Sequence, residues 1–318
     1  MYTTKQNMID NLTIAIPVFE RTEFFEEALY SLLNQTVKCK VIVVDNNSSH
    51  TFFQEICGKF KVDYFKNSSN IGMFPNWNKC FELAKTEFVM ILGDDDILDL
   101  NYVSIFQASL KDNPDIDIFF SDFELLDNDT KAISNHNHTF PYGYMKNGEK
   151  VIEYGILYRL GFPVITSVIK KEKFSGFYKD FHASNDWAWI YENIEKMVVY
   201  GENAKLLKYR YHNNNDTKKP ETLINCHISI LYIYKILLNK YTNNTKLKER
   251  LKENMTHTSL FIYTQVERDY FRSVVNDTNR YSILLKDDYN FVSKLFLLIP
   301  LKIRSFMFAI INKFGLIK

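Results

Sequence analysis

The chain has 318 residues, which is enough for one large domain or two of ordinary size, and 46% of them are hydrophobic, as in globular proteins. Its formal net charge of +1 gives no reason to expect a nucleic-acid partner. The cysteines contain no C-x-x-C pair, so that we expect neither a disulfide framework nor a zinc site.

The first third of the chain alternates between strand-like and helix-like segments. Short apolar runs predict strands at 12–19, 40–45, 62–65 and 88–92. Apolar residues at helical spacing predict helices at 22–35, 52–60 and 73–85. Thr22 is the expected N-cap of the first helix, and Pro75 falls in the first turn of the third. This alternation predicts βαβ units in a mostly parallel sheet.

The pattern changes after Lys111. A strand is expected at 116–126, followed by a polar loop that contains His136 and His138. Residues 148–215 are mixed, with expected elements at 151–159 (helix), 163–169 (strand) and 185–197 (helix). From Pro220 onward the sequence is typical of helices almost throughout.

The stretch VMILGDDDILD, Val89 to Asp99, runs an apolar strand directly into three consecutive carboxylates. Asp94, Asp95 and Asp96 would emerge together at the carboxyl end of that strand. Three adjacent like charges repel, and a divalent cation is the natural compensation because hard cations take carboxylate oxygens. The alternative interpretation is a solvated turn that caps the next helix.

Ligands of open α/β sheets bind beyond the carboxyl ends of the strands. Here those ends carry polar residues at 17–20, 45–48, 66–72 and 94–96. Together they could hold a nucleotide, with Asp45 on a base N–H or a ribose hydroxyl and the aspartates on the phosphates through a metal. Neither G-x-x-x-x-G-K-[ST] nor G-x-G-x-x-G is present, which argues against a P-loop kinase and a dinucleotide dehydrogenase.

Four segments stand in the order seen in family-two glycosyltransferases of the GT-A fold: LTIAIPVFERTEFFEEALYSLLNQT, VIVVDNNSS, NSSNIGMFPNWNKC and FVMILGDDDIL. The chain resembles this family from Leu12 to about Leu126 and more weakly to His212. The resemblance implies a Rossmann-like, mostly parallel sheet with helices on both faces, and a nucleotide-sugar donor, with a UDP-sugar favoured. The donor-binding residues would be Pro17, Phe19, Glu20, Asp45 (on the uracil ring), Asn70, Gly72, Asn78 and Asp94.

The aspartates resemble the D-x-D metal motif of that family. If the segment is aligned with the common form L-D-x-D-D of this motif, Gly93 stands at an aspartate position and Asp95 is the metal ligand. If Asp94-x-Asp96 is the motif instead, the metal ligand is Asp96. We expect one of these two to bind Mg²⁺ or Mn²⁺ and Asp94 to touch the sugar or the ribose.

An inverting sugar transfer needs a carboxylate that removes the proton of the acceptor hydroxyl. Asp186 falls in the first turn of an expected helix, whose dipole favours the ionised form. Asn185-Asp186-Trp187 resembles the segment that carries the family's base, with Asn185 in place of the more frequent Glu; the alternative role is a helix cap. The segment YRYHNNN resembles Y-R-x-H, which would turn Arg210 or His212 toward the diphosphate or the metal, and His212 is counted with the metal ligands.

The segment FVSKLFLLIPLKIRSFMFAIINKFGLIK, Phe291 to Lys318, contains five basic and no acidic residues among large apolar ones. It is either an interfacial membrane anchor or a helix that packs on the protein itself or on a second subunit of a homodimer. The N-terminus lacks a signal-peptide pattern, and no uninterrupted apolar run approaches the roughly 20 residues that span a bilayer. We therefore expect a cytoplasmic protein, peripheral at the inner face of the membrane if the anchor interpretation holds.

The sequence thus predicts a donor-binding half at 1–126, an acceptor and base half of the same domain at 127–215, and a helical extension at 216–318. The predicted activity is a metal-dependent, inverting sugar transfer to a glycan or lipid-linked saccharide in cell-surface polysaccharide biosynthesis. One alternative is a nucleotidyltransferase that makes sugar nucleotides, although IPVFERTEFF lacks the glycine-rich loop of that class. The other is a non-catalytic nucleotide-sugar-binding protein.

Overall fold

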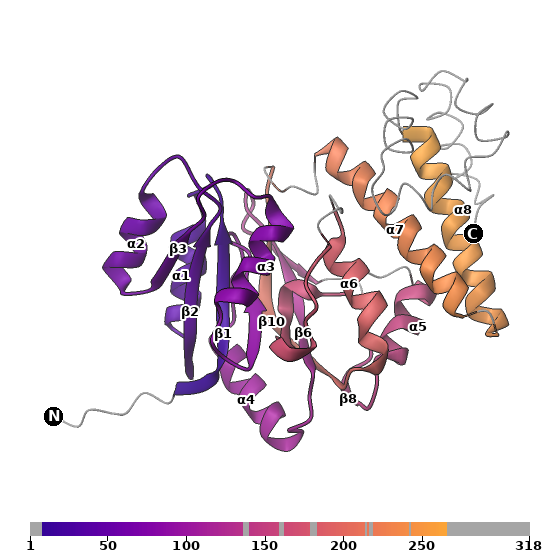
Figure 1. The fold of residues 1–318 in the computed structure, drawn as a ribbon, viewed down its shortest axis with the longest axis horizontal. Coiled ribbons are helices and arrows are strands. Elements are labelled where there is room, and N and C mark those ends of the chain that lie inside the picture. Colours follow the sequence, from indigo (N-terminus) through magenta and orange to yellow (C-terminus); the bar gives the residue numbers. More distant parts are fainter. Residues whose placement is uncertain are drawn as a thin grey trace. The chain divides into compact units, whose positions relative to one another are not determined.

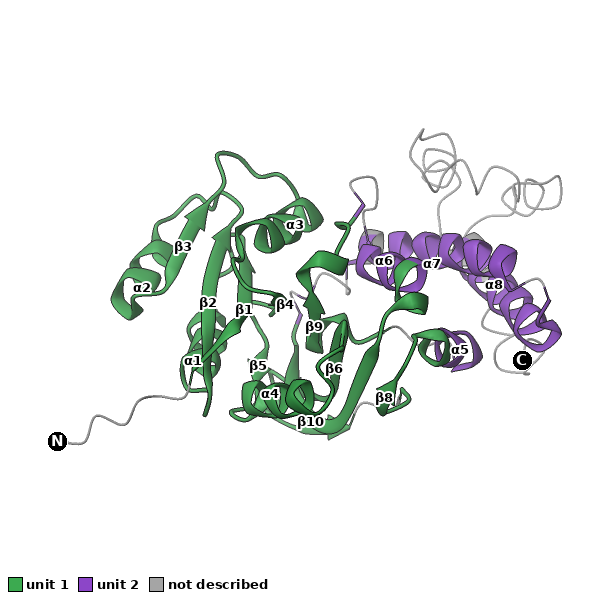
Figure 2. Cartoon of the chain, turned by 60° about the horizontal axis from the view of Figure 1, so that its bottom comes forward, with its two compact units in different colours: residues 1–151, 162–177, 193–212 green, residues 152–161, 178–192, 213–318 purple. Residues whose placement is uncertain are grey.

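The computed structural model describes residues 8–135, 140–158, 162–178, 183–213, 215, 219–241 and 243–265. The chain divides into two compact units (Figure 2), of which unit 1 comprises 1–151, 162–177 and 193–212, and unit 2 comprises 152–161, 178–192 and 213–318. Each unit is therefore assembled from segments that are distant in the sequence. The strands of the described residues all lie in unit 1.

These strands are β1 (Met8–Val18), β2 (Lys38–Asp45), β3 (Asp63–Lys66), β4 (Phe88–Ile91), β5 (Ile97–Leu98), β6 (Ile118–Asp127), β7 (Ile133–Asn135), β8 (Gly143–Met145), β9 (Ser167–Lys170) and β10 (Val199–Tyr211). In the described part of the chain they form one sheet with the order β3-β2-β1-β4-β9-β6-β10-β5, with β7 on β6 and β8 on β10. Strands β3, β2, β1 and β4 are mutually parallel, and β9 pairs antiparallel with both β4 and β6. Because β10 is parallel to β6, the strands β3, β2, β1, β4, β6 and β10 run in one direction and the sheet is mostly parallel.

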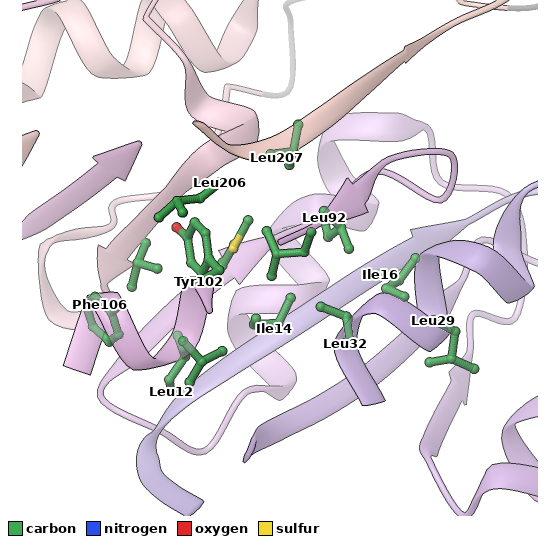
Figure 3. Packing of buried hydrophobic residues seen from close by; sticks show 14 of the residues in the cluster. Leu12, Ile14, Ile16, Leu29, Leu32, Leu92, Tyr102, Phe106, Leu206 and Leu207 are labelled. Carbon is green, nitrogen blue, oxygen red and sulfur yellow. The ribbon is translucent and has the colours of Figure 1, made fainter. Parts of the chain in front are cut away.

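Helices cover both faces of this sheet (Figure 1), and in unit 1 they are α1 (Phe25–Leu33), α2 (Phe52–Phe60), α3 (Met73–Leu83) and α4 (Tyr102–Asp112). Alternate β1 residues point to one face and pack with α1 and α4 in the core of Figure 3, which labels Leu12, Ile14, Ile16, Leu29, Leu32, Leu92, Tyr102, Phe106, Leu206 and Leu207. Helix α3 contacts β1, β2 and β4, and its buried Phe74 and Phe81 lie outside this cluster. It therefore covers the opposite face.

Unit 2 is built from helices, of which α5 (Glu149–Tyr158) begins in unit 1, and the others are α6 (Asn185–Asn193), α7 (Pro220–Lys240) and α8 (Thr245–Gln265). Helices α7 and α8 pack against each other. Helix α8 also holds the end of α5, because Arg250 Nε and Asn254 Nδ2 donate to the carbonyl oxygens of Leu157 and Ile156 at 3.1 Å and 2.8 Å.

Helix α7 is the one helix of the described residues that is long and apolar enough to cross a membrane. Its segment Thr222–Lys240 has a mean hydropathy of 1.2, and 39% of that segment is buried within the protein. A core helix meets the same criteria of length and composition.

The strand–helix alternation predicted for the first third is confirmed element by element, as is the helical character from Pro220 to residue 265. Thr22 as the N-cap of α1 is wrong, since the helix begins at Phe25 with Phe24 in the cap position and no side-chain cap. The long strand β10 was not expected. His136, His138 and the segment 291–318 lie outside the described residues.

Candidate functional site

The candidate site lies at one edge of the unit 1 sheet. Strands β1, β2, β3, β4 and β10 run in the same direction, so their carboxyl ends meet at this edge. The segments that follow them are 19–24, 46–51, 67–72 and 93–96, together with residues 210–212 at the end of β10.

Gly93 connects β4 to the three aspartates. A Cβ atom at this position would lie 2.7 Å from Asp96 Oδ2 and 2.9 Å from Asp95 Oδ1, closer than real Cβ atoms come. The two carboxylates therefore fold back over the glycine, and a side chain here would push them apart. This explains why the chain has glycine where the resemblance places an aspartate.

Asp95 lies at the centre of the cluster. Its Oδ2 atom is 2.7 Å from Arg21 Nη2 and 2.9 Å from His212 Nε2. The same guanidinium binds Asp94, and its Nη1 atom is 3.3 Å from His212 Nε2. The loop after β1, the loop after β4 and the end of β10 are thus joined through four side chains.

Asp96 is turned toward the interior and is held by β10. The backbone N–H of Arg210 donates to Asp96 Oδ1 at 3.0 Å, and Arg210 Nε donates to the carbonyl oxygen of Asp95 at 2.7 Å. The buried guanidinium also pairs with Glu27 at 2.5 Å and lies 4.6 Å from the Phe24 ring centre. Arg210 therefore fixes the aspartate loop from behind.

Burial makes the cluster costly to ionise. It raises the pKa of Asp94 to about 6, although the Arg21 guanidinium acts in the opposite direction. Burial, followed by the neighbouring Asp95 charge, raises the pKa of Asp96 well above its usual value, against the N–H of Arg210. Positive charge nearby is therefore needed to keep Asp94 and Asp96 ionised.

The donor atoms fit a divalent cation. No three His, Cys, Asp or Glu side chains of the described residues form a complete metal-binding set. Mg²⁺ in substrate-phosphate sites, however, is held by only one or two protein groups plus phosphates and waters. Asp95 Oδ2 and His212 Nε2 lie 2.9 Å apart, which is a hydrogen-bond distance, and the carboxylate oxygen is the type of ligand that Mg²⁺ prefers. Of the two candidate aspartates, Asp95 contacts Arg21 and His212, whereas Asp96 accepts a hydrogen bond from the backbone N–H of Arg210.

Asp45 ends β2 and has none of its surface exposed. Its Oδ1 atom accepts hydrogen bonds from the N–H and the hydroxyl of Ser48 at 2.8 Å and 2.7 Å, and its Oδ2 accepts one from the Tyr64 hydroxyl at 2.6 Å. A uracil N–H could reach this carboxylate only by displacing Tyr64. In the structure Asp45 fixes the turn after β2, and its contact with the uracil ring stays a prediction.

Asn46, the next residue, holds the loop after β3. Its side chain donates to Asn70 Oδ1 at 2.8 Å and to the carbonyl oxygen of Gly72, and accepts from the N–H of Ile71 at 3.0 Å. Gly72 has a φ of 89°, which favours glycine, and its N–H donates to Asn70 Oδ1. The predicted Asn70 and Gly72 therefore lie beside the end of β2, as expected.

The end of β1 presents both an apolar and an acidic side chain. Pro17 is partly buried within the strand, whereas the Phe19 side chain is 43% exposed at its end. Glu20 has a left-handed φ of 58°, and its carboxylate accepts two hydrogen bonds from Ser49, each 2.9 Å long. Glu20 therefore ties this loop to the loop after β2.

Asn78 does not join these loops through the contacts of its side chain. Its Oδ1 accepts from the N–H of Phe177 at 2.7 Å, and its Nδ2 donates to the carbonyl oxygen of Phe177 at 3.0 Å. Both ends of the amide thus clamp one residue of the 174–177 segment within unit 1. Asn78 thus fixes the 174–177 segment, and its expected contact with the donor stays a prediction.

Asp186 belongs to unit 2 and lies in the first turn of α6, as predicted. Burial raises its pKa to about 6, and the backbone N–H groups of Trp187 and of Asp186 itself offset part of this rise. The preceding Asn185 is fully buried; its Oδ1 accepts from the N–H of Tyr178 at 2.9 Å, and its Nδ2 donates to the Tyr178 carbonyl oxygen. Ser184 has a left-handed φ of 50° at the start of this helix.

Sequence reasoning assigned no role to four residues that organise the site, namely Arg21, Phe24, Glu27 and Tyr64, although the first three lie in the first segment quoted for the family resemblance. One signal was available for Arg21, because three adjacent carboxylates require a cation and Arg21 is a basic residue in the loop after β1. The other three carried no signal, because their roles depend on pairings across the sheet edge.

Comparison with known proteins identifies the family to which the chain belongs. The family model described as "Glycosyl transferase family 2" matches residues 13–171, half of the chain. The abequosyltransferase RfbV of Salmonella typhimurium is 24% identical over 278 residues, which cover 80% of this chain and 82% of RfbV. A GalNAc(5)-diNAcBac-PP-undecaprenol beta-1,3-glucosyltransferase of Campylobacter jejuni is 37% identical over 94 residues, which cover 27% of this chain and 30% of that protein.

Among solved structures, residues 1–349 of TarS from S. aureus, in complex with UDP-GlcNAc, align with a TM-score of 0.59 over 94% of this chain and 91% of that one. The identity is 13%, so this likeness concerns the fold alone. Together with the family match, it agrees with the mostly parallel sheet. The chain belongs to glycosyl transferase family 2 and has a fold of the GT-A type.

Proposed function

We propose that this protein transfers a sugar from a nucleotide-sugar, with a UDP-sugar favoured, to a glycan or lipid-linked saccharide in cell-surface polysaccharide biosynthesis. The observation that carries the proposal is the cluster of Asp94–Asp96, Arg21 and His212 at the carboxyl edge of the sheet. The names of the relatives support it, since one is an abequosyltransferase and another a glucosyltransferase named for an undecaprenol-linked saccharide. TarS binds UDP-GlcNAc, which supports a UDP-sugar donor.

At the donor end, Asp95 and His212 would hold Mg²⁺ or Mn²⁺. The bound cation would stabilise the negative charge that develops on the departing nucleoside diphosphate. Asp96 and Arg210 keep the aspartate loop in place, and Asp94 faces the sugar or the ribose. The exposed ring of Phe19 offers an apolar surface to the nucleotide base, while Asp45 and Asn46 shape the loops around it.

Asp186 acts as the general base of an inverting displacement. A carboxylate with a pKa near 6 is still ionised at pH 7, yet it is a stronger base than an ordinary aspartate. It removes the proton of the acceptor hydroxyl as that oxygen attacks the anomeric carbon.

A thermal-shift screen tests the donor site. The purified protein is heated with UDP-, GDP-, dTDP- and CMP-sugars, each with and without Mn²⁺. A ligand at 100 times its Kd stabilises the native state by about 2.7 kcal/mol, so a bound donor is readily detected. We expect a metal-dependent shift with one nucleotide class, UDP-sugars first.

The matched variants are Asp95→Asn and Asp63→Asn. Asp63 is half-exposed and pairs with Lys40 on the surface, so its replacement removes the same charge away from the site. The metal-dependent shift should disappear in D95N and persist in D63N. A protein that shows no shift with any donor would contradict the proposal and favour a non-catalytic role.

A further inference from the structure

Arg21 is bound in the position where the proposed metal would be expected. Its guanidinium contacts Asp94, lies 2.7 Å from Asp95 Oδ2 and 3.3 Å from His212 Nε2, and its side chain is 28% exposed. The two atoms that fit a cation, Asp95 Oδ2 and His212 Nε2, therefore both point at this one cationic group.

The contacts that His212 Nε2 can make depend on whether this nitrogen carries a hydrogen. A ring nitrogen either donates or accepts, so Nε2 cannot both donate to Asp95 and accept from Arg21. In one tautomer Nε2–H donates to Asp95 Oδ2 at 2.9 Å. In the other tautomer Nε2 carries no hydrogen, and Arg21 donates both to this nitrogen, at 3.3 Å, and to Asp95 Oδ2, at 2.7 Å. A metal ligand needs the same unprotonated nitrogen. Arg21 and a divalent cation thus use the same two lone pairs.

We propose that Arg21 is an internal cation that competes with the divalent metal for Asp95 and His212. This proposal rests on the metal site of the proposed function. In the metal-free protein Arg21 neutralises the aspartate pair. When the metal binds, the long and partly exposed side chain leaves Asp95, and its planar fork of donors becomes available to an oxygen of the diphosphate.

Two consequences follow for binding. The metal must displace Arg21, so its affinity for the protein without nucleotide is lowered. The nucleoside diphosphate gives the released guanidinium a new partner, so the diphosphate and the metal strengthen each other's binding by the same factor. A hydrogen bond between charged groups is worth about a ten- to hundredfold change in a binding constant, which sets the size of the expected effect.

Mn²⁺ titration of the metal-stripped, full-length protein tests this proposal, by calorimetry and by the electron paramagnetic resonance of free Mn²⁺. The proteins are wild type, Arg21→Gln, Arg21→Lys and Lys40→Gln, with and without UDP. Lys40 forms a surface ion pair with Asp63, so K40Q removes the same charge outside the site. Without UDP we expect R21Q to bind Mn²⁺ about ten times more tightly than wild type, R21K to lie between them, and K40Q to match wild type.

A second readout is thermal stability. In EDTA the melting temperature of R21Q should be lower than that of wild type, and Mn²⁺ should restore it, because the aspartates then regain a cation. If R21Q does not fold without metal, the Mn²⁺ affinity of R21K can still be compared with that of wild type. Equal or weaker Mn²⁺ binding by R21Q and R21K, while UDP-bound wild type binds Mn²⁺, would overturn the competition alone. Absence of Mn²⁺ binding in every protein, even with UDP, would instead overturn the proposed metal site and the competition with it.

Discussion

Burial of the Asp186 carboxylate lowers the stability of the native state when this group is ionised. Burial raises its pKa from 3.8 to about 6, so its proton is held more tightly in the folded protein than in the unfolded chain. The stabilisation from this proton is complete below about pH 4 and is lost as the pH rises through 6. At neutral pH the ionised carboxylate therefore destabilises the native state, by up to about 3 kcal/mol.

Asp186→Asn should raise the melting temperature at pH 7.5, because the amide carries no buried charge, while sugar transfer collapses. The gain in stability should vanish below pH 4, where both forms are neutral. Calorimetry from pH 4 to 8 measures the first effect, with Asp63→Asn as the control for loss of an exposed carboxylate. If D186N and wild type melt together at pH 7.5, burial does not destabilise the ionised carboxylate.

The pH dependence of wild-type kcat/KM offers an independent check on the same residue. A base with a pKa near 6 loses activity as protons are added, so the rate should fall about tenfold per unit below pH 6. A profile that stays flat down to pH 5 would contradict the proposed role.

At the scale of elements, two asparagines clamp consecutive residues of the chain. Asn78 of α3 holds both backbone groups of Phe177 within unit 1, and Asn185 of α6 holds both backbone groups of Tyr178 within unit 2. The peptide between these residues is where the chain passes from one unit to the other. In each clamp the side-chain amide accepts a hydrogen bond from the backbone N–H of the residue it holds and donates one to the carbonyl oxygen of the same residue.

Replacing either asparagine by alanine should lower the unfolding free energy by about 2–4 kcal/mol, because two backbone groups lose their partners. The Asn185 clamp should be the more costly to break, since that side chain is fully buried. Asn34→Ala is the control: Asn34 is exposed and makes one hydrogen bond to the carbonyl oxygen of Tyr30 at the end of α1. Urea denaturation compares the three variants, and equal midpoints for N185A and N34A would refute the clamp.

The elements also show what the sequence could and could not reveal. Strands β1, β2 and β4 were predicted because each contains an apolar run that is largely buried, and α1 to α3 because their apolar residues recur at helical spacing. Strand β3 was predicted from its short run VDYF, although most of its residues are exposed. Strand β10 was missed because Glu202, Lys205 and Lys208 interrupt its apolar residues, and its extended conformation is imposed by pairing with β6. The aspartate cluster was predictable from local charge, whereas its contact with Arg21 depends on two strand ends that meet only in the folded sheet.

At the scale of the whole molecule, the segment 291–318 lies outside the described residues, and the anchor interpretation stays a prediction from its sequence. Deletion of residues 291–318 should move the protein from the membrane fraction to the soluble fraction of a cell lysate, because the basic and apolar side chains would no longer bind the anionic surface. Lys302→Glu with Arg304→Glu is the matched variant, which reverses charge but keeps the apolar residues. An insoluble truncated chain would instead identify this segment as part of the protein core.

The order of the sheet has a consequence for synthesis on the ribosome. Strand β9 fills the place between β4 and β6, and β10 pairs with β6, but both are translated long after their neighbours. From residue 91 until residue 167 is made, the apolar strand Phe88–Ile91 has one edge without its final partner. Exposed apolar edges invite pairing with other chains. The yield of this protein in a cell should therefore depend on chaperones that shield the nascent chain during that interval.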